Sequence, residues 1–351
     1  MQDIFRNSVF LKACRREPTE VTPVWLMRQA GRYMKEYRAL RDKTPFIELC
    51  RNKDLVTEIT VKAQEKIKAD AAIIFSDILL VVEALGLGVE YGRGEGPLIR
   101  KVIRAPKDVE RLREVDPKES LSYVLDAVRQ TRASLSPRVP LIGFAGAPFT
   151  LSSYMIEGGA SKDFKRTKNF MIRQGGSWAK LMRKLVRVTI SYLRAQIEAG
   201  AQAVQLFDSW VGCLTAEEYE TYVLPYSREA IKGAAGRAPV IHFGTGTARF
   251  LEAFGSAGGE VVSVDHRAAL GEAWKKIGYS KAIQGNLDPR VLCGPLSGVR
   301  SHVKRILKEA GGRPGHIFNL GHGVLPETPV QNVIALVEMV HEWGGRQDGF
   351  R

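Results

Sequence analysis

The chain has 351 residues, of which 44% are hydrophobic and 26% are charged, and this composition excludes a disordered chain because it supplies enough apolar side chains for a full core. Lys and Arg outnumber Asp and Glu by 52 to 38, and the net charge of +14 favours an acidic partner: nucleic acid, an anionic membrane surface or a small polyanion. Composition alone does not choose among the three.

The cysteines and the apolar runs limit where the protein can act. Cys14, Cys50, Cys213 and Cys293 are far apart and form no CxxC pair, which is typical of a reducing compartment rather than of a disulfide framework. No apolar run reaches transmembrane length, and the N-terminus lacks the apolar core of a signal peptide. We therefore expect a cytoplasmic protein whose residues 1–22 form an N-terminal arm.

Short apolar runs recur along the chain, and a segment of helical period follows each run. The eight runs expected to form strands are residues 24–27, 71–75, 140–144, 203–207, 239–243, 261–264, 282–284 and 316–320. Because eight strands that alternate with helices fit one closed parallel barrel, we expect an α/β fold of the (β/α)8 TIM-barrel type rather than an open doubly wound sheet. The lack of GxGxxG after the first run agrees. The barrel is expected to be a single domain over residues 23–345, with a tail over residues 346–351.

One segment interrupts this alternation. The sequence GVEYGRGEGPLIRKVIRAP, residues 88–106, has Gly92, Gly94 and Gly96 near its middle and is typical of a β-hairpin. Because it follows the second strand and helix, we expect an insertion that lies outside the barrel.

Polar residues follow the predicted strands at the end where barrel enzymes carry their chemistry. The segments HFGTGT and QGN, at the ends of two strands, include glycines that let backbone amides approach a ligand, and VDHR, at the end of a third, supplies polar side chains. At the ends of the other strands the candidate residues are Arg28, Gln29, Asp77, Tyr154, Asp208, Ser209 and His322.

Several of these residues also have a structural explanation. Arg28 and Arg32 are one helical turn apart, so they would share a helix face that is either exposed to solvent or paired with Asp77. Asp77 and Ser209 are residue types that cap helices, and Tyr154 has the apolar neighbours of a core residue.

The histidines give little sign of a metal site. His242 and His266, at strand ends, are more readily explained as core residues than as ligands, whereas His322 lies between two glycines in a segment that buries little. No His and Cys stand at the spacing of a zinc site, and no GxSxG elbow or Walker A loop occurs. The remaining set of arginines, a carboxylate, a tyrosine, a serine and a histidine suits a ligand rich in carboxylates.

Six segments together resemble the uroporphyrinogen decarboxylase family of haem biosynthesis. They are PVWLMRQAGRYMKEYR, AAIIFSDIL, GFAGAPFTLSSYMIEGG, QLFDSW, QGNLDP and FNLGHGVLPETP, in order from Pro23 towards the C-terminal helix. The resemblance implies a distorted (β/α)8 barrel, a homodimer with facing clefts, and uroporphyrinogen, a polyanionic tetrapyrrole, as substrate. Two positions depart from the family: Lys35 stands where Pro is frequent, and His266 stands where bacterial members commonly have Trp.

The resemblance also implies which residues form the site. Arg28 and Arg32 would contact substrate carboxylates, and Asp77 would face the pyrrole nitrogens. The positive charges of residues 28–41 would then find their partners in the ligand. The other residues implied to line the site are Gln29, Ala30, Gly31, Arg41, Tyr154, Ser209 and His322.

The implied reaction removes CO2 from the four acetate side chains of uroporphyrinogen III and gives coproporphyrinogen III. Protonation of a pyrrole carbon makes the ring an electron sink, so no cofactor or metal is expected. Asp77 would stabilise the cationic ring, and the neighbouring Arg28 would lower the pKa of Asp77 and keep it ionised. The candidate proton donors are Arg28, a water molecule and a carboxyl group of the substrate.

Two other functions remain open. A methyltransferase of the same barrel superfamily, dependent on a corrinoid or a thiol, would use a zinc thiolate site, which the His and Cys spacing does not supply. A nucleic-acid-binding protein would gather basic and aromatic residues on one surface, whereas Lys and Arg are scattered here through amphipathic helices. We therefore expect neither nucleic acid nor a membrane as a partner.

Overall fold

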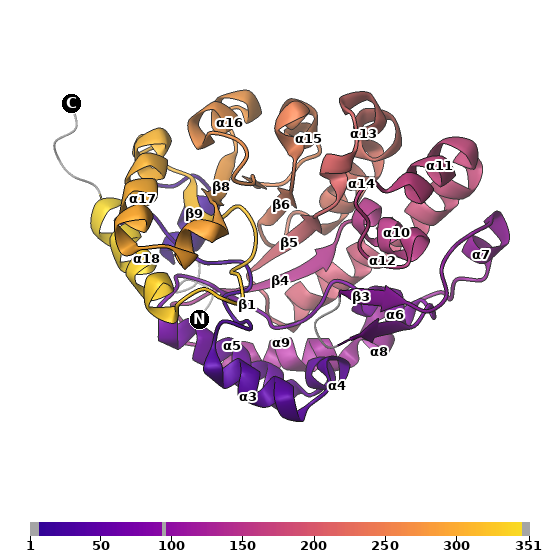
Figure 1. The fold of residues 1–351 in the computed structure, drawn as a ribbon, viewed down its shortest axis with the longest axis horizontal. Helices are drawn as coiled ribbons and strands as arrows, with labels where there is room; N and C mark the ends of the chain where they lie inside the picture. The colour runs from indigo at the N-terminus through magenta and orange to yellow at the C-terminus, as the bar shows by residue number, and fades with distance from the viewer. Residues whose placement is uncertain (1–6, 93–95, 346–351) are drawn as a thin grey trace.

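The computed structural model describes residues 7–92 and 96–345, which form a curled parallel sheet surrounded by helices (Figure 1). The sheet has seven strands in the order β1-β4-β5-β6-β7-β8-β9, so strands that are successive in the chain are neighbours in the sheet. They are β1 (Ala72–Ile73), β4 (Leu141–Gly146), β5 (Ala203–Asp208), β6 (Val240–Gly244), β7 (Val261–Ser263), β8 (Ala282–Leu287) and β9 (His316–Leu320). Seven of the eight predicted strands are thus confirmed.

The eighth predicted strand, residues 24–27, forms a single parallel bridge between Val24 and Phe318 of β9. The amide of Phe318 donates to the carbonyl of Pro23 at 2.8 Å, and on the other side the amide of Asp70 donates to the carbonyl of Val24 at 2.8 Å. The amide of Val24 donates to the Asp70 carboxylate, at 2.7 Å, rather than to a backbone carbonyl. The segment therefore closes the barrel between β9 and β1, although a side chain replaces part of the strand ladder.

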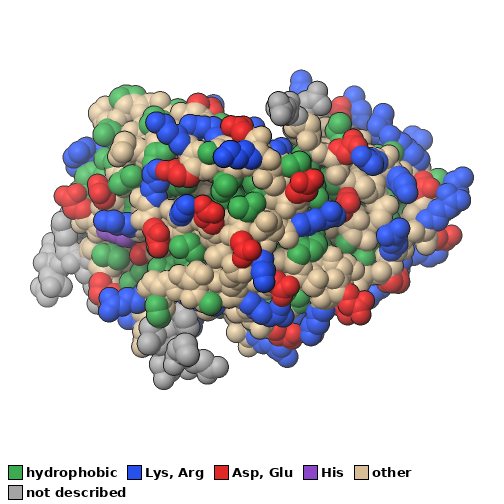
Figure 2. Space-filling view, turned by 90° about the horizontal axis from the view of Figure 1, so that it is seen from below, with side chains coloured by type: hydrophobic (Ala, Val, Ile, Leu, Met, Phe, Trp, Pro, Cys, Tyr) green, Lys and Arg blue, Asp and Glu red, His purple; other side chains and the backbone are tan. Residues whose placement is uncertain are grey.

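Helices cover the outside of the sheet and present charged side chains of both signs on the face shown in Figure 2. The apolar faces of the helices point inward. In α12, the longest of the described helices, Leu181, Leu185 and Leu193 are fully buried. The α-helices are α2 (Val9–Cys14), α3 (Lys35–Lys43), α4 (Phe46–Arg51), α5 (Lys53–Ile67), α6 (Leu80–Ala84), α7 (Pro106–Glu110), α8 (Pro117–Ser120), α9 (Ser122–Ser134), α10 (Pro148–Glu157), α11 (Lys165–Arg173), α12 (Gly175–Ala199), α13 (Ala216–Tyr222), α14 (Leu224–Ala234), α15 (Leu251–Ser256), α16 (Leu270–Ile277), α17 (Leu296–Ala310) and α18 (Val330–Trp343). Short 3-10 helices are η1 (Val211–Cys213), η2 (Thr247–Arg249) and η3 (Pro289–Cys293).

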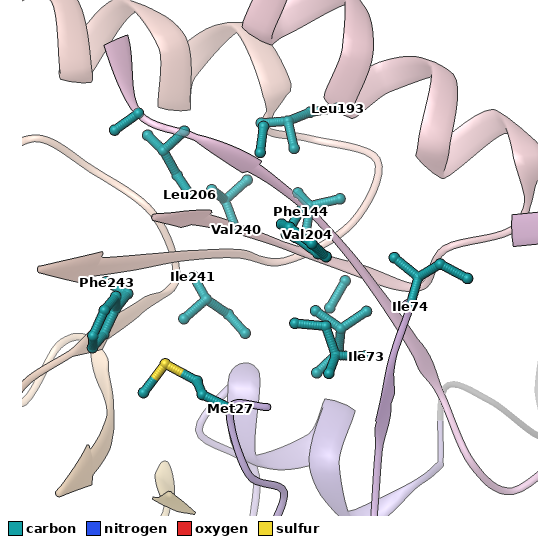
Figure 3. Packing of buried hydrophobic residues seen from close by; sticks show 14 of the residues in the cluster. Met27, Ile73, Ile74, Phe144, Leu193, Val204, Leu206, Val240, Ile241 and Phe243 are labelled. Carbon is teal, nitrogen blue, oxygen red and sulfur yellow. The ribbon is translucent and has the colours of Figure 1, made fainter. Parts of the chain in front are cut away.

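Side chains fill the interior of the barrel, as Figure 3 shows for Met27, Ile73 and Ile241, which come together from three segments. The interior also holds a hydrogen bond between two buried side chains, in which Gln284 Nε2 donates to Gln205 Oε1 at 3.0 Å. Strands buried on both faces explain why the sequence runs are continuously apolar rather than alternating.

The predicted hairpin insertion is confirmed. Strand β2 (Val89–Tyr91) pairs antiparallel with β3 (Pro97–Ile99) in a separate two-stranded sheet, and Gly94 of its turn lies outside the described residues. The amide of Val89 donates to the Glu83 carboxylate at 2.5 Å, and the amide of Ile99 donates to the carbonyl of Gly158 at 2.8 Å. These bonds tie the hairpin to α6 and to the end of α10.

The described part of the predicted N-terminal arm, from residue 7 onward, packs against the barrel. Phe10, Leu11 and Cys14 of α2 are buried, and α2 contacts β9. Residues 1–6 of the predicted arm and the predicted tail over 346–351 lie outside the described residues. In the part of the chain that is described, no helix has the length and apolar character needed to cross a membrane.

Candidate active site

The predicted site begins in the turn that follows residues 24–27. Arg28 has a left-handed backbone with φ of 61°, a conformation that is uncommon for a residue with a side chain and that clusters at functional sites. The buried side chain of Gln29 locks this turn, because its Oε1 accepts from the amide of Leu26 at 3.1 Å and its Nε2 donates to the carbonyl of Ala71 at 3.1 Å. Ala30, next in the turn, is partly buried against the core.

Arg28 and Arg32 do not share a helix face, and that prediction is wrong. The left-handed backbone of Arg28 excludes this residue from an α-helix, and α3 begins only at Lys35, after Arg32. Both arginine side chains are nevertheless exposed on the same turn. At Gly31 an added Cβ would lie 2.8 Å from the carbonyl oxygen of Arg28, so the turn excludes a side chain there.

The GHG segment after β9 lies directly against Arg28. A Cβ on Gly323 would lie 2.4 Å from Cδ of Arg28, and a Cβ on Gly321 would lie 2.2 Å from the backbone nitrogen of His266. Because neither glycine has a side chain, Arg28 packs against Gly323 and His266 packs against Gly321, one on each side of His322. Burial lowers the pKa of His322 to about 4, and the charge of Arg28 adds to this effect. His322 is thus neutral near pH 7 and offers one ring N–H as a donor.

Asp77 lies just beyond the carboxyl end of β1 and is half-buried. Its Oδ1 accepts from the amide of Leu79 at 2.8 Å, so it also supports the backbone before α6 in the manner of a cap. Burial raises the pKa of Asp77 above the usual range, against the opposing effects of the Leu79 amide, Tyr91 and Arg28. The charge of Arg28 lowers this pKa, as predicted, but burial has the larger effect, so the net shift is upward and not downward.

Tyr154 and Ser209 reach the same rim from α10 and from the end of β5. Burial raises the pKa of Tyr154 to about 12, and the negative charge of Asp77 adds to the rise. The ring of Tyr154 lies 5.7 Å from that of Trp210, which directly follows Ser209. The carbonyl of Ser209 accepts from the hydroxyl of Thr245 at 2.6 Å, which holds this turn in place.

Arg41 on α3 and Arg32 in the turn before it are the other predicted arginines. The Arg41 guanidinium is 5.8 Å from the centroid of the Phe46 ring. Burial raises the pKa of Tyr37, while the charges of Arg41 and Arg32 oppose this rise and that of Asp77 adds to it. The charges of Arg41, Arg32 and Asp77 thus all act on Tyr37.

Tyr91 on the hairpin lies at the site but escaped the sequence analysis. Its ring centroid is 4.6 Å from that of Phe46, and its hydroxyl is buried without a hydrogen bond of ordinary geometry to any described residue. Burial raises the pKa of Tyr91, and the nearby Asp77 adds to this rise. The sequence signalled the hairpin, but nothing in its pattern indicated that the hairpin packs against the barrel rim.

Asp208 is the last residue of β5, and the sequence assigned it no contact with substrate. It is fully buried, its Oδ1 accepts from the hydroxyl of Thr150 at 2.9 Å, and the Thr150 oxygen accepts from the amide of Trp210 at 3.3 Å. Burial raises the pKa of Asp208 to about 7. A buried carboxyl group therefore supports the turn that carries Ser209.

Two further histidines, His242 of β6 and His266 after β7, differ in their burial. His242 is fully buried with its ring stacked on Phe254 at 3.8 Å, and burial lowers the pKa of His242 to about 3. His266, predicted to be a core residue, is instead partly exposed at the rim, with its Nε2 3.9 Å from Oδ2 of Asp288. Within residues 7–92 and 96–345, no three His, Cys, Asp or Glu side chains are grouped in a way that could hold a metal ion.

Comparisons with known proteins cover almost the whole chain. The sequence model of the family described as "Uroporphyrinogen decarboxylase (URO-D)" matches residues 5–343. The chain is 52% identical over 333 residues to the uroporphyrinogen decarboxylase of Sorangium cellulosum, which is 95% of each chain. It is 50% identical over 337 residues to that of Carboxydothermus hydrogenoformans, which is 96% of each chain.

Solved structures share the fold at lower identity. A methyltransferase from Methanosarcina mazei has a TM-score of 0.80 at 20% identity, with coverage of 96% of this chain and 99% of that one. A B12-independent methionine synthase from Shewanella sp. W3-18-1 has a TM-score of 0.56 at 10% identity, with coverage of 83% and 87%. At these identities the likeness concerns the fold alone, and it confirms the barrel architecture.

Proposed function

The chain belongs to the uroporphyrinogen decarboxylase family, and from this premise we propose that it converts uroporphyrinogen III to coproporphyrinogen III by removing CO2 from the four acetate side chains. The observation that carries the proposal is the position of Asp77, half-buried at the carboxyl end of β1 with Arg28 close enough to affect its pKa. That end of the strands is where barrel enzymes carry their chemistry.

We infer that the arginines bind the substrate carboxylates. Arg28 and Arg32 are exposed in one turn, and Arg41 lies nearby on α3. Arginine keeps its charge at any working pH and matches a carboxylate with two parallel hydrogen bonds. Each charge-assisted bond contributes about 1.5–3 kcal/mol, so several of them offset much of the hydration that the macrocycle loses. Ser209, Tyr154 and the neutral His322 add hydrogen-bond donors around the ring.

Decarboxylation needs a place for the electron pair that CO2 leaves behind. Protonation of a pyrrole carbon makes a ring cation conjugated with the acetate arm, and loss of CO2 returns the pair to the ring as an exocyclic methylene. Protonation of the methylene and release of the added ring proton complete the step, so one proton is consumed for each CO2. The tetrapyrrole thus acts as its own electron sink, a role that cofactors fill in many other decarboxylations.

We assign stabilisation of the ring cation to Asp77. A carboxylate held beneath the pyrrole N–H groups lowers the energy of the cation as it forms, and one preorganised group of this kind contributes about 3–4 kcal/mol. Pyrrole N–H donors and a positive ring both favour the ionised carboxylate, so bound substrate opposes the rise in pKa that burial causes. The candidate proton donors are a water molecule, a carboxyl group of the substrate and Arg28, whose guanidinium holds its proton tightly and is a weak acid.

We further propose a homodimer that acts in the cytoplasm, with a barrel over residues 23–345, an arm over 1–22 and a tail over 346–351. All four cysteines are free thiols, which suits a reducing compartment. On the face in Figure 2, Lys and Arg are mixed with Asp and Glu, which supports a small-molecule partner over nucleic acid or a membrane. Light scattering tests the dimer, and a monomeric mass would contradict it.

A barrel-fold methyltransferase dependent on a corrinoid or a thiol is the alternative, because the Methanosarcina mazei enzyme shares the fold. One fold carries many unrelated chemistries, so the fold alone does not decide between the two activities. The match of the decarboxylase family over residues 5–343 favours decarboxylation.

The direct test is anaerobic incubation of the purified protein with uroporphyrinogen III, followed by separation of the products by carboxyl number. We expect intermediates with seven, six and five carboxylates, and then the product with four. Octacarboxylate that persists unchanged, together with transfer of a methyl group from a methylated thiol or corrinoid, would overturn the assignment.

A further inference from the structure

The β2–β3 hairpin forms a fixed wall beside Asp77. Its first strand is bonded to α6 through the Val89 amide and the Glu83 carboxylate, and its second strand is bonded to the end of α10 through the Ile99 amide and the Gly158 carbonyl. Helix α6 follows Asp77 in the chain, and α10 follows β4, the neighbour of β1 in the sheet. The hairpin is therefore held against the two elements that frame the carboxylate.

Tyr91, the last residue of β2, occupies the inner side of this wall. Its ring packs on Phe46 with centroids 4.6 Å apart, and Phe46 packs on Phe75 at 5.9 Å. Because Phe75 precedes Asp77 by two residues, these aromatic contacts connect the hairpin to the strand end that carries the carboxylate. The Tyr91 hydroxyl is buried, and no described residue pairs with it in ordinary hydrogen-bond geometry. Hydrogen bonds in active sites are often long until substrate binds, so an unpaired buried hydroxyl beside a carboxylate marks a candidate contact.

We propose that Tyr91 is a positioning residue whose hydroxyl donates a hydrogen bond to the Asp77 carboxylate and holds it ionised beneath the pyrroles. The inference rests on the proposed function and adds the hairpin to the machinery of the barrel. Tyr91 already lowers the pKa of Asp77, and Asp77 raises that of Tyr91, which keeps the phenol in its donor form. The other ionisable groups that face Asp77, from the turn, α3, α4, α10 and α12, are Arg28, Tyr37, Cys50, Tyr154 and Tyr192.

The test compares the pH profile of kcat/KM in wild type and Tyr91→Phe, which keeps the ring on Phe46 and removes only the hydroxyl. Because Tyr91 lowers the pKa of Asp77, its loss raises that pKa, and the acid limb of the profile moves to higher pH. Loss of a hydrogen bond to a charged group predicts a shift of about one pH unit, with about a tenfold loss on the acid side that recovers as the pH rises. The substrate carboxyl groups titrate identically with both enzymes.

Tyr279→Phe is the control, because Tyr279, in the turn between α16 and β8, also belongs to an aromatic pair, with Trp274 at 5.7 Å, and β8 is not a neighbour of β1 in the sheet. It should leave the profile unchanged. Tyr91→Leu, which removes the ring as well, separates the hydroxyl from packing.

An unshifted acid limb in Tyr91→Phe would overturn the inference. So would a uniform loss at every pH, or a loss confined to Tyr91→Leu, since packing alone produces both. A wild-type protein that forms no product from uroporphyrinogen III would reject the proposed function, and the inference with it, before any variant is compared.

Discussion

Asp77 carries the negative charge that the proposed chemistry requires beneath the ring nitrogens. In the wild type the backbone amide of Leu79 donates to Oδ1 of Asp77 at 2.8 Å. The side-chain oxygen of Asn in Asp77→Asn can still accept this bond, so the fold should be retained. The ring cation loses its counter-charge, and we expect kcat to fall by about a hundredfold or more. Single-turnover kinetics at saturating uroporphyrinogen measure the effect, with circular dichroism as the check on folding. Turnover near the wild-type rate would remove Asp77 from the mechanism.

Asp208 should make the stability of the native state fall with pH. Its pKa is about 7 in the fold, whereas an unfolded aspartate titrates near pH 4. The native state therefore holds this proton more tightly, and the stability it contributes is fully present below about pH 4 and is lost as the pH rises through 7. Asp208→Asn keeps the acceptor for Thr150 but cannot ionise.

We therefore expect the stability of Asp208→Asn relative to wild type to increase by roughly 2–3 kcal/mol between pH 5 and pH 8. Urea unfolding of both proteins at the two pH values measures this difference, and all other titrating groups cancel in the comparison. A difference that does not change with pH would show that the buried carboxyl group does not titrate as the geometry indicates.

At the scale of elements, α2 tests how far residues 1–22 act as a peripheral arm. Phe10 is fully buried and α2 contacts β9, so Phe10→Ala should destabilise the barrel by about 3–5 kcal/mol. Lys12→Ala, which removes a surface pair with the exposed Glu20 at 3.7 Å, is the control and should cost less than about 1 kcal/mol. Equal urea midpoints for the two variants would mean that the arm is not part of the folding unit.

The strands were predictable because apolar runs of this length, buried on both faces, leave a local signal in the sequence. The segment 24–27 carries the same signal but makes only one bridge, since the Asp70 carboxylate takes the Val24 amide. The four-residue spacing of Arg28 and Arg32 predicted a helix that does not form, because Arg28 adopts a left-handed backbone. A four-residue spacing places two side chains on one face only if the backbone between them is helical. Here the side-chain hydrogen bonds of Gln29 to Leu26 and Ala71 hold the backbone in a turn instead.

The whole molecule carries a net charge of +14, and its proposed substrate is a polyanion. Electrostatic attraction between the two should speed their encounter, and salt should screen it. We expect kcat/KM to fall by about tenfold or more from low to high ionic strength, while kcat changes little. Steady-state kinetics across a salt series measure both constants, and a kcat/KM that is independent of salt would exclude long-range steering.

The sequence by itself determined the barrel class and most of the residues that meet at its rim, because periodicity and short contiguous motifs are properties of neighbouring residues. Only the tertiary structure decided that residues 24–27 join the sheet through a single bridge, that Tyr91 packs on Phe46 near Asp77, and that burial raises the pKa of Asp77 despite Arg28. Each of these depends on contacts between segments far apart in the chain and on the water that their packing excludes, and no local pattern encodes either.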